Sequence, residues 1–290
     1  MANIIITGCS SGIGFATAVM LAKNKHVVFA TMRHPSQHQE LQDIADNKNL
    51  PIIILPLDVT KDNSIKNAIS QVLFYTDKID VLVNNAGIGT LGSIEELPIE
   101  DFIEQMDTNF IGTVRCTKAV LPHMRKKKGG CIINISSVGG KLFNYFNAPY
   151  SASKAAVEAF SECLAMEVRP FGIRVAVVEP GVIDTPLQDK CKSRIGETSY
   201  PNLERSIAFF SAARDHHVPP EVVAETILQI VNGESATFRN PTGPDSKPLL
   251  GFRASMSDED WIAGADIDDQ TWISMMEGMQ LDVRKYLTRL

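Results

Sequence analysis

The sequence predicts an α/β fold, with a mainly parallel, doubly wound seven-stranded sheet and helices on both of its faces. Short runs of apolar, often β-branched residues alternate along the chain with stretches in which apolar residues recur at helical spacing. The runs are continuously apolar, which is typical of parallel strands buried on both faces. The first run, residues 4–6, leads directly into a glycine-rich turn and a helix, as a nucleotide-binding βαβ unit does.

Three glycines follow this first strand, Gly8, Gly12 and Gly14, in the spacing Gly-x-x-x-Gly-x-Gly. Glycine permits positive φ and lets the backbone come close to a ligand. The free amides at the start of the following helix, together with the helix dipole, favour a phosphate group. We therefore interpret the segment as a nucleotide-binding turn, and the alternative is an ordinary glycine-rich turn.

The remaining elements follow in regular alternation. Further strands are expected at residues 26–31, 52–57, 79–83, 131–136, 173–179 and 236–240. Helices are expected at residues 39–47, 62–74, 99–123, 149–168 and 221–231. Pro122 should distort or end the helix over 99–123, whereas Pro219 and Pro220 begin the last helix, which stops near Gly233.

The alternation continues without a repeat or linker to residue 240, which predicts one dinucleotide-binding domain over residues 1–240. Within it, the long connection at 186–218 is typical of a lid or binding loop and is expected to form a substrate lobe. Residues 241–290 form a C-terminal extension that carries acidic residues near Trp261 and Trp272. The sequence leaves open whether this extension is an acidic surface segment or a packing arm.

The composition argues against several function classes. The chain has 290 residues, of which 44% are apolar, and a net charge of −6, so nucleic acid is not an expected partner. No apolar stretch approaches the ~18 residues of a transmembrane span, and no leader-like segment precedes the first strand. The cysteines are scattered, which indicates reduced thiols in the cytoplasm rather than disulfides or a zinc site. They are Cys9, Cys116, Cys131, Cys163 and Cys191.

Tyr150 and Lys154 form the first candidate catalytic pair. Side chains at positions i and i+4 share one face of a helix, so both can reach one ligand. A phenol has an ordinary pKa of ~10, and a nearby ammonium group lowers it toward the range useful for proton transfer. The pair therefore suits acid/base chemistry, and the alternative is a tyrosine that simply packs.

Polar side chains at two other places could join this pair. Ser136 and Ser137 follow the strand at 131–136, where a hydroxyl could donate a hydrogen bond to a substrate oxygen, or else cap a helix. Asn109 lies inside a predicted helix, where an amide side chain is unfavourable unless it has a partner. A serine hydrolase is not expected, because the chain has no Gly-x-Ser-x-Gly motif.

Together these motifs resemble one known family. They occur in the order Thr7-Gly8-x-x-x-Gly12-x-Gly14, Asn84-Asn85-Ala86-Gly87, Asn109, Ser137, Tyr150-x-x-x-Lys154 and Pro180-Gly181. Over about residues 2–240, the chain resembles the short-chain dehydrogenase/reductase family, whose members have the Rossmann fold. The glycine turn and the segments 30–33 and 137–140 are most similar to its hydroxysteroid and retinol dehydrogenase branch.

The resemblance implies roles for the candidate residues. Tyr150 would be the proton donor in reduction and the acceptor in oxidation, and Lys154 would lower its pKa and bind the nicotinamide ribose. Ser137 would hold the substrate oxygen, and Asn109 would bend its helix and hold a water in the proton relay. No metal is expected, because the cofactor supplies the hydride.

The same resemblance implies a nicotinamide dinucleotide site. NADP(H) is expected in preference to NAD(H), because the second strand ends without the acidic residue of an NAD site and Arg33 can pair with a 2′-phosphate. The alternative is that Arg33 is a solvated loop arginine. The expected cofactor-binding residues are Thr7, Gly8, Ser10, Ser11, Gly12, Ile13, Gly14, Arg33, Asp58, Val59, Asn85, Ala86, Gly87, Tyr150, Lys154, Pro180, Gly181, Ile183 and Thr185.

The expected substrate is an apolar alcohol or carbonyl compound, of hydroxysteroid, retinoid, or aliphatic aldehyde or ketone type. Two apolar groups should face the cleft, although they could instead pack the lobe onto the core. They are Leu142, Phe143, Tyr145 and Phe146, and in the lobe Leu187, Ile195, Tyr200, Leu203, Ile207, Phe209 and Phe210. A homodimer or homotetramer is also implied by the resemblance. The alternatives are a catalytically silent dinucleotide-binding sensor and, within enzymes, an epimerase or dehydratase.

Overall fold

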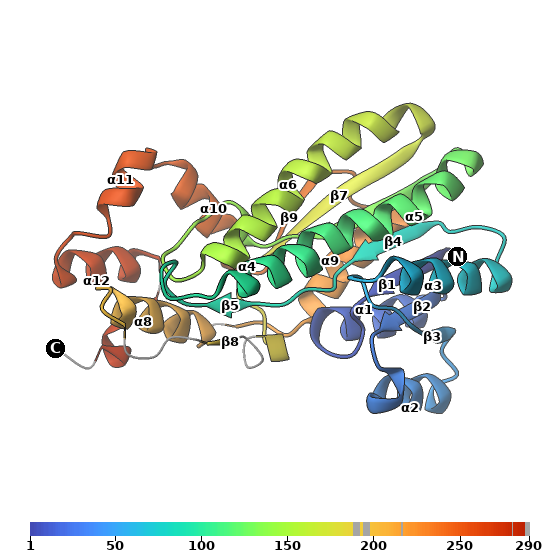
Figure 1. Ribbon diagram of the computed structural model, residues 1–290, viewed down its shortest axis with the longest axis horizontal. Helices are drawn as coiled ribbons and strands as arrows, with labels where there is room; N and C mark the ends of the chain where they lie inside the picture. Colours follow the sequence, from blue (N-terminus) through green and yellow to red (C-terminus); the bar gives the residue numbers. More distant parts are fainter. Residues whose placement is uncertain (188–191, 194–197, 216, 280, 288–290) are drawn as a thin grey trace.

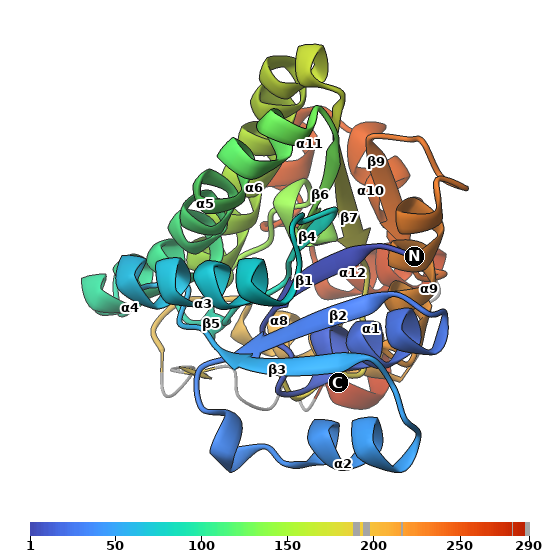
Figure 2. The ribbon, with the colours of Figure 1, turned by 90° about the vertical axis from the view of Figure 1, so that its right-hand side faces the viewer.

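Seven parallel strands form one sheet in the order β3-β2-β1-β4-β6-β7-β9, which confirms the predicted fold class (Figures 1 and 2). The computed structural model describes residues 1–187, 192–193, 198–215, 217–279 and 281–287, so Cys191 and Ile195 lie outside the described residues. The strands are β1 (Asn3–Thr7), β2 (Val27–Met32), β3 (Ile52–Pro56), β4 (Val81–Asn84), β6 (Gly130–Ile135), β7 (Ile173–Pro180) and β9 (Arg239–Thr242).

The helices cover both faces of this sheet. They are α1 (Gly12–Lys23), α2 (Glu40–Asn47), α3 (Asp62–Tyr75), α4 (Ile99–Met106), α5 (Gly112–Lys127), α6 (Ala148–Val168), α8 (Leu203–Arg214), α9 (Glu221–Asn232), α10 (Ser246–Ala254), α11 (Asp258–Ala263) and α12 (Asp269–Gly278). Ile4 and Ile6 pack toward α1, α2 and α9, and Ile5 packs toward α3, α5 and α6 (Figure 2). Within the part of the chain that is described, no helix combines the length and apolar character needed to cross a membrane.

The strand order places a crevice beside the glycine turn. β1 lies between β2 and β4, so the chain builds outward from β1 in one direction through β3 and in the other through β9. At such a reversal the connections leave the carboxyl ends of neighbouring strands on opposite sides, and ligands of open α/β sheets bind there. The glycine turn follows β1 and the segment 85–88 follows β4, so both lie at this point.

The prediction for Pro122 was wrong. Helix α5 continues through Pro122 to Lys127, and the helical stretch is distorted instead at the π-helical turn Asp107–Ile111. A proline removes one hydrogen bond, but Val120 and Met124 on either side of it are fully buried and hold both turns against the sheet. The chain leaves the helix at Lys128, which has a left-handed φ of 53°.

Short or edge strands were the other departures. The sequence analysis missed a parallel two-stranded pair, β5 (Thr90–Leu91) with β8 (Lys192–Ser193), because strands of two residues carry no periodicity. The last strand begins at Arg239 rather than at residue 236 and contains Pro241. β9 is at the edge of the sheet, where a residue without an N–H is tolerated.

The C-terminal extension packs against the lobe, which decides between the two alternatives left open by the sequence. Ile273 and Trp272 of α12 are buried against Ala208 and Ala212 of α8. Arg205 of α8 also pairs with Asp269 at 2.7 Å. The extension is therefore a packing arm, whereas the domain boundary at residue 240 stays a prediction.

We expect Ile273→Ala to lower the free energy of unfolding by about 2–5 kcal/mol, because a fully buried isoleucine would leave a cavity. Ile262→Ala is the matched control, since this α11 side chain is 71% exposed and its loss should change the free energy by about 0.5 kcal/mol or less. Urea unfolding followed by tryptophan fluorescence measures both. Equal effects in the two variants would contradict the packing of α12 onto the lobe.

Candidate active site

The glycine turn after β1 is held by side chains from β1 and the end of β4. Thr7 Oγ1 accepts hydrogen bonds from the backbone N of Asn85 at 2.9 Å and of Ala86 at 3.0 Å. In return, Asn85 Nδ2 donates to the carbonyl oxygens of Thr7 at 2.8 Å and Gly8 at 3.1 Å. These four hydrogen bonds fix the turn against the segment that follows β4.

The glycines of this turn leave no room for a side chain. Gly8 has a φ of +75°, and a Cβ there would lie 2.8 Å from the Cα of Ala86. A Cβ on Gly14 would lie 2.4 Å from the carbonyl oxygen of Gly8. The turn and the start of α1 are thus packed closely against the segment after β4 and against each other, with no side chain on these glycines, which fits a dinucleotide whose phosphates are bound by backbone amides.

The segment after β7 reaches the same turn. A Cβ on Gly12, whose φ is +59°, would lie 3.2 Å from the Cβ of Thr185. Ile183 is buried and pairs with Val218 in an isolated bridge. Pro180 ends β7 and Gly181 follows it, so the residues expected at the nicotinamide end lie at the carboxyl edge of the sheet with the glycines.

Arg33 and Asp58 lie at the ends of β2 and β3, where the adenosine is expected. Burial acts to raise the pKa of Asp58, but hydrogen bonds from the N and Oγ1 of Thr60 and the charge of Arg33 hold it below its usual range. Arg33 itself is exposed, and Val59 is buried against Gly112.

A polar cavity of about 160 Å³ lies between the glycine turn and the start of α2. Ser10 of the turn lines it, together with Gln37, His38 and Gln39. The other expected contacts are distributed around the turn. Ser11 is the N-cap residue of α1, Ile13 packs against the core, and Gly87 lies beside the Oδ1 of Asn109.

Ser137 and Tyr150 converge on one point above Gly139. A Cβ built on Gly139 would lie 3.2 Å from Cε1 of Tyr150 and 3.5 Å from Oγ of Ser137. Ser137 precedes the 3₁₀ turn Val138–Gly140, and its Oγ accepts a hydrogen bond from the N of Gly139 at 3.1 Å. Ser136, by contrast, is buried in the end of the sheet. Of the two serines, only Ser137 is half-buried at the cleft beside Tyr150.

Lys154 lies one helical turn after Tyr150 and is only 5% exposed. Its Nζ donates a hydrogen bond to the carbonyl oxygen of Ile135, at the end of β6, over 2.8 Å. The same Nζ lies 5.7 Å from the centre of the Tyr150 ring. Burial lowers the pKa of Lys154 to about 8, although the negative charge of Glu158 opposes that effect. The structure therefore places the buried ammonium group of Lys154, with its lowered pKa, beside the phenol of Tyr150.

Asn109 connects three segments from within the π-helical turn. Its Oδ1 accepts from the N of Ile88 at 2.8 Å, and its Nδ2 donates to the O of Ile88 at 3.0 Å. Nδ2 also donates to Oγ of Ser153 at 3.0 Å, and that hydroxyl donates to the O of Tyr150 at 2.8 Å. The buried amide thus has partners on both sides, and it ties the segment after β4 to the helix that carries Tyr150.

Sequence reasoning missed two residues of this framework. Ser153 lies between Tyr150 and Lys154, and its signal was a small polar residue on the same helix near the pair. Asp245 accepts from the N of Val182 at 2.7 Å, and its carboxylate occupies the place that a Cβ on Gly181 would take, at 2.1 Å. No local pattern could have indicated Asp245, because its partners are more than sixty residues earlier in the chain.

The two apolar groups lie in segments that the C-terminal arm connects. Leu142 and Phe146 are buried, whereas Phe143 is exposed and its carbonyl accepts from Nε1 of Trp261 at 2.8 Å. Burial raises the pKa of Tyr145 to about 12, and a hydrogen bond with Trp272 opposes this effect. In the lobe, Tyr200 and Ile207 are exposed, and Leu187, Leu203, Phe209 and Phe210 are partly buried.

Several known proteins are similar to this chain in sequence. A family profile described as "short chain dehydrogenase" matches residues 2–195. A 3-ketodihydrosphingosine reductase of Bacteroides thetaiotaomicron is 39% identical over 83% of this chain and 87% of its own. Human retinol dehydrogenase 8 is 34% identical over 87% of this chain and 84% of its own. Human 17-beta-hydroxysteroid dehydrogenase type 1 is 33% identical, over 86% and 80% respectively.

Several solved structures share the fold of this chain. A short-chain dehydrogenase from Streptomyces avermitilis superposes with a TM-score of 0.77 at 30% identity and covers 97% of each chain. ElxO with NADP bound has a TM-score of 0.69 at 31% identity, over 83% of this chain and 95% of its own. A 3-ketoacyl-(acyl-carrier-protein) reductase from Brucella melitensis complexed with NADH has a TM-score of 0.70 at 25% identity, over 82% and 95%.

Proposed function

Because this chain belongs to the short-chain dehydrogenase/reductase family, we propose that it transfers a hydride between NADP(H) and an apolar alcohol or carbonyl compound. Membership of this family and similarity to its oxidoreductases indicate an enzyme that acts on alcohol or carbonyl groups with a nicotinamide dinucleotide. One observation carries the detailed proposal: Ser137 and Tyr150 converge above Gly139 while the Lys154 ammonium lies 5.7 Å from the Tyr150 ring.

The roles of these side chains follow from their hydrogen bonds. Ser137 Oγ uses a lone pair to accept from Gly139, so its own proton is available to a substrate oxygen. The Tyr150 hydroxyl gives a proton to that oxygen in reduction and takes it back in oxidation. The Lys154 ammonium favours the phenolate form of Tyr150. When bound, the cofactor supplies or accepts the hydride.

We expect Tyr150→Phe to lower kcat by roughly 10² or more while cofactor affinity stays nearly unchanged, because only the transferable proton is lost. Tyr75→Phe, at the exposed end of α3, is the matched control and should keep full turnover. Steady-state kinetics and a cofactor titration by fluorescence measure the two properties. Near-normal turnover of Tyr150→Phe would refute the role. No turnover in the unaltered protein, with cofactor bound, would favour the silent sensor.

Preference for NADP(H) is supported by the charge at the end of β2. Arg33 is exposed there, and its charge acts on Asp58 at the end of the neighbouring strand β3. Ser10, His38 and the adjoining glutamines supply further donors around the neighbouring polar cavity. A 2′-phosphate would find a guanidinium and several neutral donors in this region.

We expect Arg33→Ala to raise the Michaelis constant for NADP(H) about tenfold to a hundredfold and to leave that for NAD(H) nearly unchanged. This range corresponds to the loss of a charge-assisted hydrogen bond worth about 1.5–3 kcal/mol. Lys48→Ala, an exposed cation that ends α2, is the control. Equal use of both cofactors by the unaltered enzyme would contradict the preference.

An apolar substrate is supported by the two apolar groups, at residues 142–146 and in the lobe, and by the C-terminal arm that joins them. Trp261 donates a hydrogen bond to the carbonyl of Phe143, and Trp272 contacts Tyr145 and packs on α8. The polar groups gather instead at the point between Ser137 and Tyr150. A mostly apolar pocket with a few convergent polar groups is the usual form of a small-molecule site.

We expect kcat/KM to rise along a series of straight-chain aldehydes, by up to ~0.8 kcal/mol for each methylene buried. The series should be compared with a sugar aldehyde and a 2-oxo acid of similar size. Retinoid, steroid and fatty carbonyl compounds should rank above these polar ones. A flat series with a polar compound as the best substrate would overturn the proposed substrate class.

We further propose that the enzyme is a cytoplasmic homodimer or homotetramer. Three large apolar side chains are exposed on α4 and α6, and exposed apolar surface is a common feature of protein–protein contacts. They are Ile99, Ile103 and Met166.

A further inference from the structure

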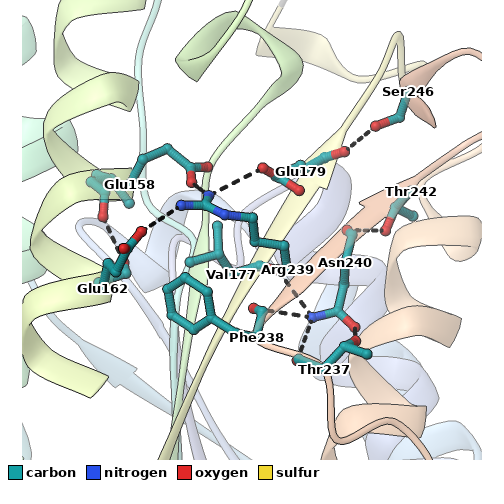
Figure 3. Close-up of polar contacts among 12 residues, drawn as sticks. Glu158, Glu162, Val177, Glu179, Thr237, Phe238, Arg239, Asn240, Thr242 and Ser246 are labelled. Carbon is teal, nitrogen blue, oxygen red and sulfur yellow. Dashed lines mark hydrogen bonds and ion pairs between the residues drawn. The ribbon is translucent and has the colours of Figure 1, made fainter. Parts of the chain in front are cut away.

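A cluster of three carboxylates and one guanidinium lies between α6, the helix that carries Tyr150 and Lys154, and the strands β7 and β9 (Figure 3). Arg239 of β9 contacts Glu158 of α6 through Nη1, and the same nitrogen lies 3.4 Å from Oε1 of Glu179 on β7. Its Nη2 donates to Oε2 of Glu162, one turn further along α6, at 2.9 Å. The proposed function assigns no role to any of these four residues.

Two of the carboxylates are buried and one is not. The side chains of Glu158 and Glu179 are 3% and 2% exposed, whereas that of Glu162 is 62% exposed. A buried carboxylate is costly unless it is paired, and Arg239 supplies the pairing for Glu158. Arg239 therefore binds two buried carboxylates, which need a partner, and one solvated carboxylate, which does not.

Glu158 is the member of the cluster that faces the catalytic lysine. It lies four residues after Lys154 on α6, so the two side chains share one face of the helix. Gly140 packs against both, because a Cβ there would lie 3.2 Å from Cγ of Glu158 and 3.2 Å from the backbone C of Lys154. Oε1 of Glu158 is buried and has no hydrogen-bond partner among the described residues, so its charge is not neutralised locally on that side.

Glu179 is the second buried carboxylate, and it is affected by the charge of Glu158. Burial and the negative charge of Glu158 raise the pKa of Glu179, and Arg239 opposes this effect. The charge of Glu158 also acts on Lys154, whose pKa would otherwise be lowered further by burial.

We propose that Glu158, held by Arg239, is a positioning residue that keeps the Lys154 side chain charged and in place beside Tyr150. The inference rests on the proposed function, since it acts through the residue that sets the state of the phenol. Other charged or titratable groups lie around Lys154 or around the carboxylate cluster, but Glu158 is the carboxylate that shares the helix face of Lys154. These groups are Tyr150 on α6, Lys141 after the 3₁₀ turn, Glu179 on β7 and Arg239 on β9.

The direct test is the titration of Lys154 itself, followed by NMR of protein with ¹³C-labelled lysine side chains. The Lys154 signal is assigned by its absence from Lys154→Arg. In Glu158→Gln, the midpoint should move to lower pH by about one unit or more, because an opposite charge near the ammonium has been removed. Glu162→Gln is the matched control, since it removes another carboxylate from the same arginine, and its midpoint should stay in place.

A second variant covers the case in which Glu158→Gln does not fold. Glu158→Met puts an apolar side chain of similar length in the same place, and Arg239 keeps Glu162 and Glu179 as its partners. The Lys154 midpoint should again move to lower pH. An unmoved midpoint in whichever of these two variants folds would overturn the proposal.

Activity supplies an independent arm. In the direction of carbonyl reduction, the alkaline limb of kcat/KM in Glu158→Gln should move down by as much as the NMR midpoint, because the charged lysine is lost at lower pH. A moved limb is not expected from a merely structural role. If the NMR midpoint moves but the unaltered protein reduces no carbonyl compound, the proposed function fails and the coupling of Glu158 to Lys154 stands. If the limb and midpoint both stay, the coupling fails alone.

Discussion

The hydrogen bond from the buried Lys154 ammonium to the carbonyl of Ile135 is the contact on which the rest of the site depends. It joins helix α6 to the end of β6, and Ser137 follows that strand two residues later. The same helix carries Tyr150, so one contact fixes the relation between the hydroxyl that would hold a substrate oxygen and the phenol that would protonate it. A charged amine buried to this extent is costly unless it is hydrogen-bonded, and the carbonyl of Ile135 supplies that hydrogen bond.

Most of the sheet could be predicted because its strands are uninterrupted apolar runs, and a parallel strand buried on both faces has no other simple sequence form. Residues 4–6 and the glycine turn were of this kind. The features that could not be predicted depend on partners distant in sequence. Helix α5 passes through Pro122 because Val120 and Met124 are buried, and burial is a tertiary property. The spacing of Tyr150 and Lys154 indicated a shared face, but not the depth that lowers the pKa of the lysine to about 8.

The candidate cofactor residues divide in a similar way. The glycines could be identified because their spacing between a strand and a helix has a physical reason, and the structure gives that reason as contacts too short for a Cβ. Thr7 and Asn85 were expected to meet the cofactor, and the structure places their side chains on the turn itself. These two side chains therefore shape the turn, and their contact with the cofactor stays a prediction. Arg33 is exposed, and its proposed role, binding the 2′-phosphate of NADP(H), depends on the ligand.

The position of Asp245 has a consequence for how the chain is made. Its carboxylate fills the space over Gly181 and binds the N of Val182, so the edge of the cleft after β7 is completed by a residue that is synthesised 63 residues after Val182. The strands β1 to β7 can pair while synthesis continues, yet the floor of the site stays open until β9 and the arm arrive. A chain that lacks the residues after β9 would have the glycine turn and Tyr150, but the edge of the cleft after β7 would be incomplete. Competence for chemistry in this sense depends on residues after β9, which are synthesised later than the glycine turn and Tyr150.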